Sequence, residues 1–254
     1  MNEHAEKAKW ILDNKGITGV PANSLGEIAK TENIRYKLCR LEDMPDLDGL
    51  LTYRGPKVGL LVNTIKDNIG RQNFTFAHEL GHFFLKHEPS YNSDGENGFR
   101  CTMNESATDQ REVEANKFAV ELLMPESMFR PLLAGATLDF VLIGSMARRF
   151  MVSKHACCNR ILDFISGNYA VIHSKGTAIT CCKTSKAAGS QIKRLKTIPA
   201  ETHAFQVIEN KRNQNEFAEC DLIKWLPTAP QNSKIYEYTH GSFQNGVAMT
   251  ILTW

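Results

Sequence analysis

Two histidines and a glutamate stand at a spacing that suits a metal-dependent hydrolase. His78 and His82 are four residues apart, so on a helix both imidazoles lie on one face and can bind one ion. Glu79 lies close enough to that face to reach a water on the ion. The pattern H-E-x-x-H is typical of zinc hydrolases, which combine two nitrogen ligands with a carboxylate general base. We predict that His78 and His82 bind Zn²⁺ and that Glu79 is the catalytic base.

The residues around this motif are mostly apolar from Phe74 to Leu85, which predicts a buried helix. Burying two histidines and a glutamate without partners is costly, and a metal ion satisfies all three at once. The alternative is a buried helix whose histidines and glutamate only hydrogen-bond with their neighbours.

A zinc hydrolase site needs a third protein ligand and an open fourth position. The residue six positions after His82 is Glu88 instead of a further histidine. His87 is five residues on, about 140° around the helix, so we expect it to face elsewhere. The third ligand should therefore come from a later segment of the chain.

The candidate segment is a predicted helix from Arg111 to Pro125, with Thr108 or Asp109 as its cap. Glu112 shares one face of this helix with small and apolar neighbours, which suits a ligand that approaches the first helix. Glu114 and Glu121 lie on another face, where we expect them to meet solvent. The helical pattern leaves either of these two open as the ligand instead of Glu112.

At these residues the chain resembles the ImmA/IrrE family of zinc metallopeptidases. The likeness rests on F-T-F-A-H-E-L-G-H from Phe74 to His82 and on E-x-x-A-N-x-F-A-x-E-L-L-M-P from Glu112 to Pro125, in the family's order. The resemblance implies that Glu112 is the third ligand and Zn²⁺ the cofactor. A looser likeness covers about residues 1–165.

The resemblance also implies an activity and partners. Relatives are metalloendopeptidases that make one site-specific cut in a helix-turn-helix transcriptional repressor, which releases stress-response, mobile-element or antiphage-defence genes. Some respond to DNA damage, with single-stranded DNA as the proposed activator. Two other classes stay open: a DNA-binding transcriptional regulator with a vestigial metal site, and a toxin-like peptidase held inactive by a partner.

Composition places the chain among ordinary globular proteins, with 254 residues of which 42% are hydrophobic and 23% charged. The N-terminal residues lack the pattern of a signal peptide, and no run of about 18 apolar residues predicts a membrane span. Seven cysteines show no disulfide framework. We therefore expect a cytoplasmic protein with reduced thiols and no membrane contact.

The predicted fold class is α+β. A mainly helical, zincin-like metallopeptidase domain with a small sheet should cover residues 1–166, and a smaller α/β domain that contains a sheet should cover 167–254. Some relatives carry a GAF-like sensor module in this second place. Predicted strands are 34–38, 49–53 and 58–63 in the first domain; in the second, hairpins turn at 175–176 and 244–246.

One strand and one pair of helices are candidates for binding a substrate or DNA. Strand 58–63 is our candidate for the sheet edge that holds the substrate backbone. The helical pair within 138–166 either packs against the catalytic helices, which we favour, or forms a DNA-binding helix-turn-helix.

Residues 88–109 are predicted to form a long loop between the two ligand helices. Cys101 within it could occupy the fourth zinc position in a resting state and exclude the attacking water. The alternative is a small, semi-buried cysteine.

Positive charge gathers in the second half of the chain. Residues 166–254 hold 10 Lys and Arg against 6 Asp and Glu, whereas residues 1–165 hold 20 against 22. A basic stretch without acids contains candidates for nucleic-acid contact, the alternative being a solvated loop. The candidates are Lys183, Lys186, Lys193, Arg194 and Lys196.

Overall fold

The computed structural model describes residues 3–88, 90–91, 97–101, 109–189, 192–214 and 216–254, with backbone only at 90–91, 97–101 and 193. The chain forms two compact units. The first comprises Met1–Phe129 and Gly144–Cys157, and the second comprises Arg130–Ile143 and Cys158–Trp254. Each unit contains helices and a sheet, so the predicted α+β class is confirmed. The domain boundary after residue 166 stays a prediction.

The first unit contains a sheet with the strand order β1-β3-β2-β5-β4. β1 runs parallel to β3, and the other neighbours are antiparallel. The strands are β1 (Ile34–Cys39), β2 (Gly49–Arg54), β3 (Lys57–Asn63), β4 (Ser90–Tyr91) and β5 (Asn97–Cys101). The three strands predicted for this region are β1, β2 and β3.

Two sequence predictions about this sheet are wrong. Strand 58–63 cannot be an open edge, because β3 pairs with β1 on one side and with β2 on the other. The segment predicted as a loop contains β5, which pairs with the second edge of β2. The free edge of β2 would leave a row of backbone N–H and C=O groups without hydrogen-bond partners. Pairing with the short strand β5 supplies these partners.

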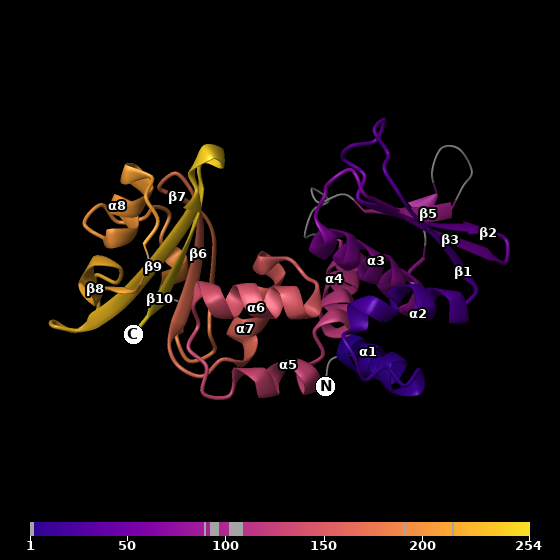
Figure 1. Ribbon diagram of the computed structural model, residues 1–254, viewed down its shortest axis with the longest axis horizontal. Coiled ribbons are helices and arrows are strands. Elements are labelled where there is room, and N and C mark those ends of the chain that lie inside the picture. The colour runs from indigo at the N-terminus through magenta and orange to yellow at the C-terminus, as the bar shows by residue number, and fades with distance from the viewer. Residues whose placement is uncertain (1–2, 89, 92–96, 102–108, 190–191, 215) are drawn as a thin grey trace. The chain divides into compact units, whose positions relative to one another are not determined.

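Helices α2 and α3 of the first unit pack against one face of this sheet, and α4 packs on α3 and α1 (Figure 1). Leu51, Leu60 and Val62 point inward from alternate strand positions, and Ala77 and Leu80 of α3 meet this layer; each is at most 2% exposed. The helices are α1 (Glu3–Asn14), α2 (Leu25–Thr31), α3 (Ile69–Phe84), α4 (Gln110–Leu123) and α5 (Glu126–Phe129).

Helices α6 (Phe140–Phe150) and α7 (Lys154–Phe164) form the predicted helical pair. The turn between them lies on the first turns of α3. The Asn73 side chain donates a hydrogen bond to the Met151 carbonyl at 2.8 Å. A Cβ on Gly70 would lie only 2.4 Å from backbone atoms of Val152 and Ser153. The turn of the pair thus packs against the helix that carries the H-E-x-x-H motif.

The second unit contains an antiparallel sheet with the order β7-β6-β10-β9-β8. Both predicted hairpins are present: β6 pairs with β7, and β9 with β10. The strands are β6 (Tyr169–Lys175), β7 (Ala178–Thr184), β8 (Ala218–Asp221), β9 (Lys234–Ser242) and β10 (Val247–Thr253), joined by α8 (His203–Asn210).

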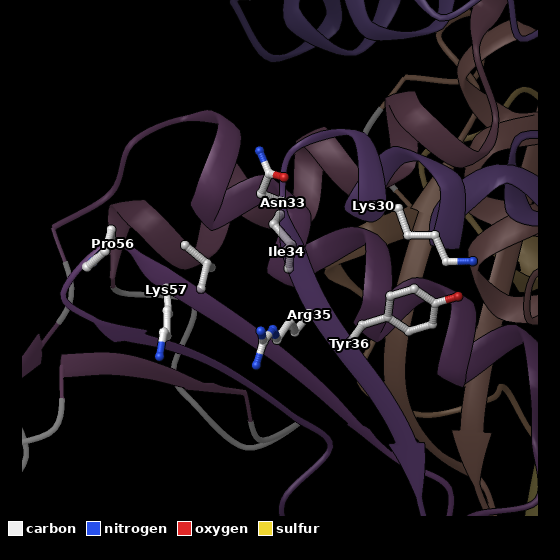
Figure 2. Close-up of a pocket in the computed structure, with 8 residues that line it drawn as sticks. Lys30, Asn33, Ile34, Arg35, Tyr36, Pro56 and Lys57 are labelled. Carbon is white, nitrogen blue, oxygen red and sulfur yellow. The ribbon is translucent and has the colours of Figure 1, made fainter.

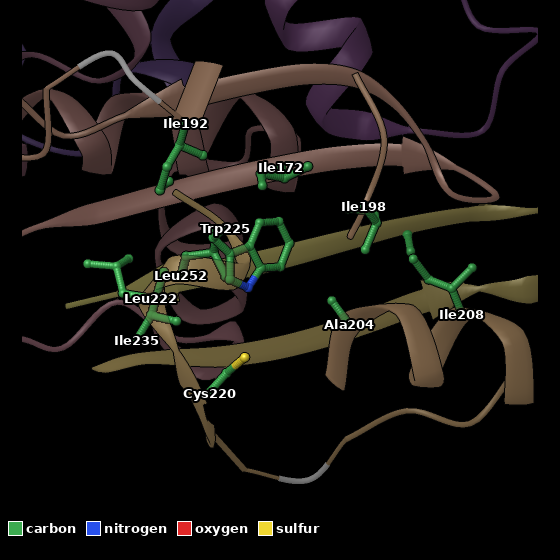
Figure 3. Packing of buried hydrophobic residues seen from close by; sticks show 12 residues of the cluster. Ile172, Ile192, Ile198, Ala204, Ile208, Cys220, Leu222, Trp225, Ile235 and Leu252 are labelled. Atoms are coloured by element: carbon green, nitrogen blue, oxygen red, sulfur yellow. The ribbon is translucent and has the colours of Figure 1, made fainter. Parts of the chain in front are cut away.

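One face of this sheet has a hydrophobic core centred on Trp225 (Figure 3). Trp225, Ile172 and Ile235 are fully buried. Glu237 is also fully buried, and its two oxygens accept from Trp225 Nε1 at 3.0 Å and from the Ala204 amide at 2.8 Å. The second unit therefore has an apolar core of its own and a buried carboxylate bonded at both oxygens. Across the described part of the chain, every helix is too short or too polar to cross a bilayer.

The close approach at Gly70 makes a test of this packing. Gly70→Ala should lower the free energy of unfolding by about 1–3 kcal/mol, because the added methyl overlaps backbone that cannot move aside freely. Gly144→Ala on α6 is the matched control: its Cβ would meet only Arg148 Nη1 at 3.7 Å, so it should gain about 0.5–1 kcal/mol from helix propensity. Urea unfolding of both variants measures the difference. Equal stability of Gly70→Ala and the natural protein would contradict the packing.

Candidate metal centre

Helix α3 carries the H-E-x-x-H residues on its buried side. The Asn68 side chain caps its start by accepting from the Arg71 amide at 3.0 Å. His78, Glu79 and His82 are each at most 2% exposed. The helix therefore delivers three polar side chains into the protein interior, where each needs a partner.

Helix α4 brings the acidic residue to them. Asp109 caps it, as predicted, by accepting from the Arg111 amide at 2.9 Å, and Glu112 lies in the first turn. The two helices can approach closely because residue 81 is a glycine. A Cβ at this position would lie only 3.1 Å from the Ala115 Cα. A glycine at this position lets Glu112 reach the histidines of α3.

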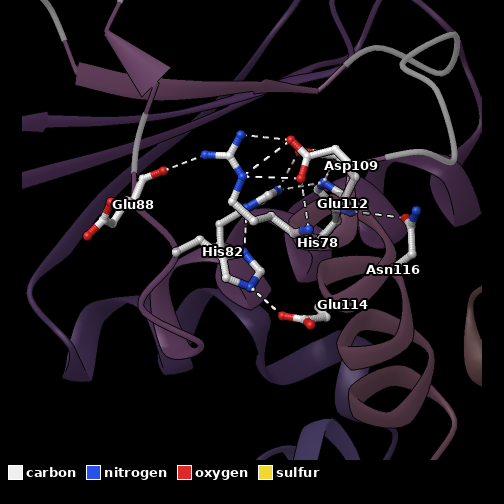
Figure 4. A network of polar contacts seen from close by, with 9 residues as sticks. His78, His82, Glu88, Asp109, Glu112, Glu114 and Asn116 are labelled. Carbon is white, nitrogen blue, oxygen red and sulfur yellow. Dashed lines mark hydrogen bonds and ion pairs between the residues drawn. The ribbon is translucent and has the colours of Figure 1, made fainter.

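The three side chains meet at one point (Figure 4). His78 Nε2 lies 3.1 Å and His82 Nε2 lies 3.2 Å from the Glu112 carboxylate, and the two Nε2 atoms are 3.0 Å apart. Ligand atoms 2.0–2.1 Å from a tetrahedral zinc are separated by about 3.3 Å. Two imidazole nitrogens and a carboxylate at this separation form a donor set that fits a divalent metal ion.

The outer nitrogens of both rings support this assignment. His78 Nδ1 lies 3.0 Å from Asn116 Oδ1, an acceptor, so the ring proton of His78 belongs on Nδ1. His82 Nδ1 lies 2.9 Å from His87 Nδ1. If His82 donates from Nδ1 to His87, both Nε2 atoms present lone pairs to each other and to Glu112, as metal binding through Nε2 requires. In that tautomeric state the three acceptors would repel one another unless a cation lay between them.

The charge states agree with a cation site. Burial lowers the pKa of His82 to about 4, so this ring is neutral near pH 7. Burial raises the pKa of Glu112, but contacts with His78 and His82 outweigh burial and hold that pKa below its ordinary value. Glu112 is therefore an ionised carboxylate beside the neutral imidazole of His82, the protonation states in which these two groups bind metals.

Glu79 lies between α3 and the sheet. A Cβ on Gly49 of β2 would lie 2.7 Å from Glu79 Oε1, so the glycine lets the carboxylate lie in its present position against this strand. Tyr53 is four residues after Gly49 in β2, so both residues are on the same face of the strand. Burial, and then the charge of Glu79, raise the pKa of Tyr53 to about 12, so its phenol stays protonated and can donate a hydrogen bond. Sequence analysis missed Tyr53, although strand alternation from Gly49 places it on the inner face.

The prediction that His87 faces elsewhere is wrong. The helix ends at Phe84, and the chain reverses through Lys86 with a positive φ of 56°. A helical projection therefore does not apply to His87, which returns to His82. Glu114 is also placed differently from our expectation: its carboxylate contacts His87 Nε2 at 3.2 Å instead of lying free in solvent. Among the described residues, neither Glu114 nor Glu121 joins the metal-ligand group.

Two further candidates lie partly outside the described structure. Cys101 ends β5, and its backbone pairs with Gly49, but its side chain lies outside the described residues. Lys193 belongs to a short helical turn, and its side chain lies outside them too. The proposed roles of both residues stay predictions.

The remaining basic candidates differ among themselves. Lys183 contacts Asp163 at 2.9 Å and donates to the Asn159 carbonyl at 2.7 Å, so a carboxylate already compensates its charge. The other three are exposed: Lys186, Arg194 and Lys196.

A separate hollow of about 720 Å³ lies beside the start of β1 (Figure 2). Lys30, Arg35 and Lys57 line it, and none of the three forms an ion pair within the described part of the chain. It contains no carboxylate, histidine or cysteine. It shares no residue with the metal-ligand group and has no side chains of the kinds that bind zinc.

Residues 46–162 match a peptidase family model described as the IrrE N-terminal-like domain, and this span contains both motifs. None of the curated proteins matches. A solved Mycobacterium tuberculosis transcriptional regulator is similar to the chain, with 15% identity and a TM-score of 0.63 over 100% of this chain and 77% of that chain. At this identity the likeness shows the fold alone.

The approach of the two ligand helices can be tested at Gly81. In Gly81→Ala the new methyl would lie 3.1 Å from the Ala115 Cα and 3.2 Å from its carbonyl oxygen, so α4 must shift away by a few tenths of an ångström. A strain of about 1–3 kcal/mol at the ligand helices corresponds to a loss of roughly tenfold or more in zinc affinity. Competition with a chromogenic chelator measures it. Gly144→Ala, which adds the same methyl where α6 has room, should leave the affinity unchanged.

Proposed function

We propose that this chain is a zinc-dependent endopeptidase, because residues 46–162 match the model of the IrrE N-terminal-like domain family of peptidases. The observation that carries the proposal is the convergence of His78 Nε2, His82 Nε2 and the Glu112 carboxylate within 4.8 Å of one another. Glu79 precedes His82 by three residues on the same helix, so a carboxylate base lies beside this donor set.

The proposed mechanism assigns each residue one task. His78, His82 and Glu112 would hold the ion, which when bound makes a water molecule more acidic and polarises the scissile carbonyl. Glu79 takes the proton of that water and returns it to the leaving amine. Burial within α3 keeps Glu79 in place, and the space over Gly49 lets its carboxylate lie against the sheet.

The substrate we propose is a helix-turn-helix transcriptional repressor, cut at one site. The family resemblance supports this substrate, and the consequence would be derepression of stress-response, mobile-element or antiphage-defence genes. We place the reaction in the cytoplasm. The six cysteines whose side chains the structure describes form no disulfide with one another, which suits a reducing compartment.

Activation by single-stranded DNA is a further part of the proposal. Lys186, Arg194 and Lys196 are exposed and are the residues at which to look for phosphate contacts. The second unit would act as the sensor module, as in relatives with a GAF-like domain. DNA binding that disappears with salt and leaves cleavage unchanged would count against this role.

Two competing functions make different predictions. A DNA-binding regulator would use the pair α6 and α7, but the turn of this pair is packed on α3 through Asn73 and Gly70. That packing favours a supporting role for the pair. A toxin-like peptidase would cut many proteins and would be released by loss of a partner.

The test compares the natural protein with Glu79→Gln and His78→Ala. Each is incubated with candidate helix-turn-helix repressors and with unrelated proteins, with and without chelator and single-stranded DNA. We expect Glu79→Gln to keep bound zinc but lose cleavage by a factor of at least about 10², because the base is gone and the ligands remain. His78→Ala should lose the metal as well. Fragments are followed by mass spectrometry and zinc by elemental analysis.

Each other outcome has one meaning. Proteolysis retained by purified Glu79→Gln would overturn the assignment of the base. Cleavage that survives removal of all metal would overturn the metallopeptidase mechanism. Cuts in unrelated proteins would favour the toxin-like alternative over a dedicated repressor.

Cys101 provides a second prediction. If its thiolate occupies the fourth zinc position at rest, Cys101→Ala should raise basal cleavage, because water can then reach the ion. Its backbone pairs with Gly49, the residue that lies against Glu79, which puts the end of β5 near the base. Initial rates of the two proteins on the same substrate measure the effect. No gain in basal cleavage would remove the proposed inhibitory role.

A further inference from the structure

A histidine beyond the end of α3 contacts the outer edge of a metal ligand. The chain reverses at Lys86, where φ is 56°, and the His87 amide donates to the His82 carbonyl at 3.1 Å. This backbone bond places the His87 ring against His82, with the two Nδ1 atoms 2.9 Å apart. Only 6% of the His87 side chain is exposed, so little water competes for this contact.

The far nitrogen of His87 is held in turn by α4. His87 Nε2 lies 3.2 Å from Glu114 Oε2, and Gln110 donates to the other Glu114 oxygen at 2.7 Å. A continuous series of hydrogen bonds therefore runs from His82 through His87 and Glu114 to Gln110. The series joins the end of α3 to the first turn of α4, the same two elements that supply the proposed metal ligands.

The protons along this series have one consistent arrangement. If His82 binds a metal through Nε2, its proton is on Nδ1 and is donated to His87 Nδ1. His87 Nδ1 must then be unprotonated, so His87 carries its proton on Nε2 and donates a hydrogen bond to the Glu114 carboxylate. Each contact contains one donor and one acceptor, and no proton is missing or left over.

We infer that His87 and Glu114 are positioning residues that fix the ring orientation and tautomer of His82, so that its Nε2 faces the metal. The inference rests on the proposed metal site. The other ligand, His78, is held by the neutral amide of Asn116 at 3.0 Å. His82 differs because a carboxylate lies behind its partner, which makes His87 Nδ1 a better acceptor and His82 a stronger ligand.

The decisive measurement is zinc affinity, with Co²⁺ as a spectroscopic probe. His87→Ala removes the acceptor and should weaken zinc binding by about 10–100-fold, the usual effect of losing such a partner. His87→Asn can place an amide oxygen near the position of Nδ1 and should restore most of the affinity. Glu114→Gln keeps the shape and removes the charge, so its loss should lie between these two. Lys117→Ala, an exposed change on α4, is the control and should bind zinc normally.

The Co²⁺ spectrum separates positioning from a general effect on folding. In His87→Ala the visible absorption bands of bound Co²⁺ should shift or broaden, because the His82 ring is free to rotate. A purely structural role would lower the unfolding temperature of the metal-free protein and leave those bands unchanged. Should His87→Ala fail to fold, His87→Asn and Glu114→Gln, which keep most of the side-chain volume, decide the question by the same spectrum and affinity.

The outcomes distinguish this inference from the proposed function. Zinc affinity and Co²⁺ bands equal to the natural protein in both His87→Ala and Glu114→Gln would overturn the positioning role and leave the metallopeptidase proposal intact. A natural protein that binds neither Zn²⁺ nor Co²⁺ would overturn both. Loss of affinity in His87→Ala with rescue in His87→Asn supports the inference.

Discussion

The site depends on the mutual repulsion of three hydrogen-bond acceptors. His78 Nε2, His82 Nε2 and Glu112 lie 3.0–3.2 Å apart. When both ring protons are on the Nδ1 atoms, as metal binding through Nε2 requires, all three groups direct lone pairs at one point. A cation between them converts this repulsion into attraction. Without one, the arrangement would cost free energy, because the atoms are buried and water cannot easily separate them. The surrounding structure makes sense as a means of holding these atoms together.

Several local features serve that purpose. The glycine at position 81 sets the distance between α3 and α4, and Gly49 leaves room for Glu79 under β2. The caps at Asn68 and Asp109 fix where the two helices begin, and therefore which residues reach the centre. The turn around Val152 supports the other end of α3. Each of these features involves one or two residues. Each positions the backbone of a helix or strand and does not contact the candidate ligands directly through a reacting group.

The extent to which sequence predicted this site follows from the range of the interactions. His78, Glu79 and His82 belong to one helix, so their relation is local and the 3.6-residue repeat was sufficient. The assignment of Glu112 as the third ligand was harder to predict. The helical pattern left Glu114 and Glu121 as alternatives, and only the family motif distinguished Glu112 from them. His87 was misplaced because the helical projection was extended past Phe84, where the helix had ended. The pairing of β5 with β2 was missed for a related reason: strand partners far apart in sequence leave little local signal.

The close packing of α3 on α4 also bears on which ions the centre can accept. Glu112 lies on a capped helix whose distance from α3 is set by Gly81 and Ala115, so the packing of the two helices determines how far apart the three candidate ligands lie. A calcium ion, which needs six to eight oxygens at about 2.3–2.6 Å, would have to force two packed helices apart. Discrimination between metals in this protein would thus depend on the packing of Gly81 against Ala115, neither of which is a candidate ligand.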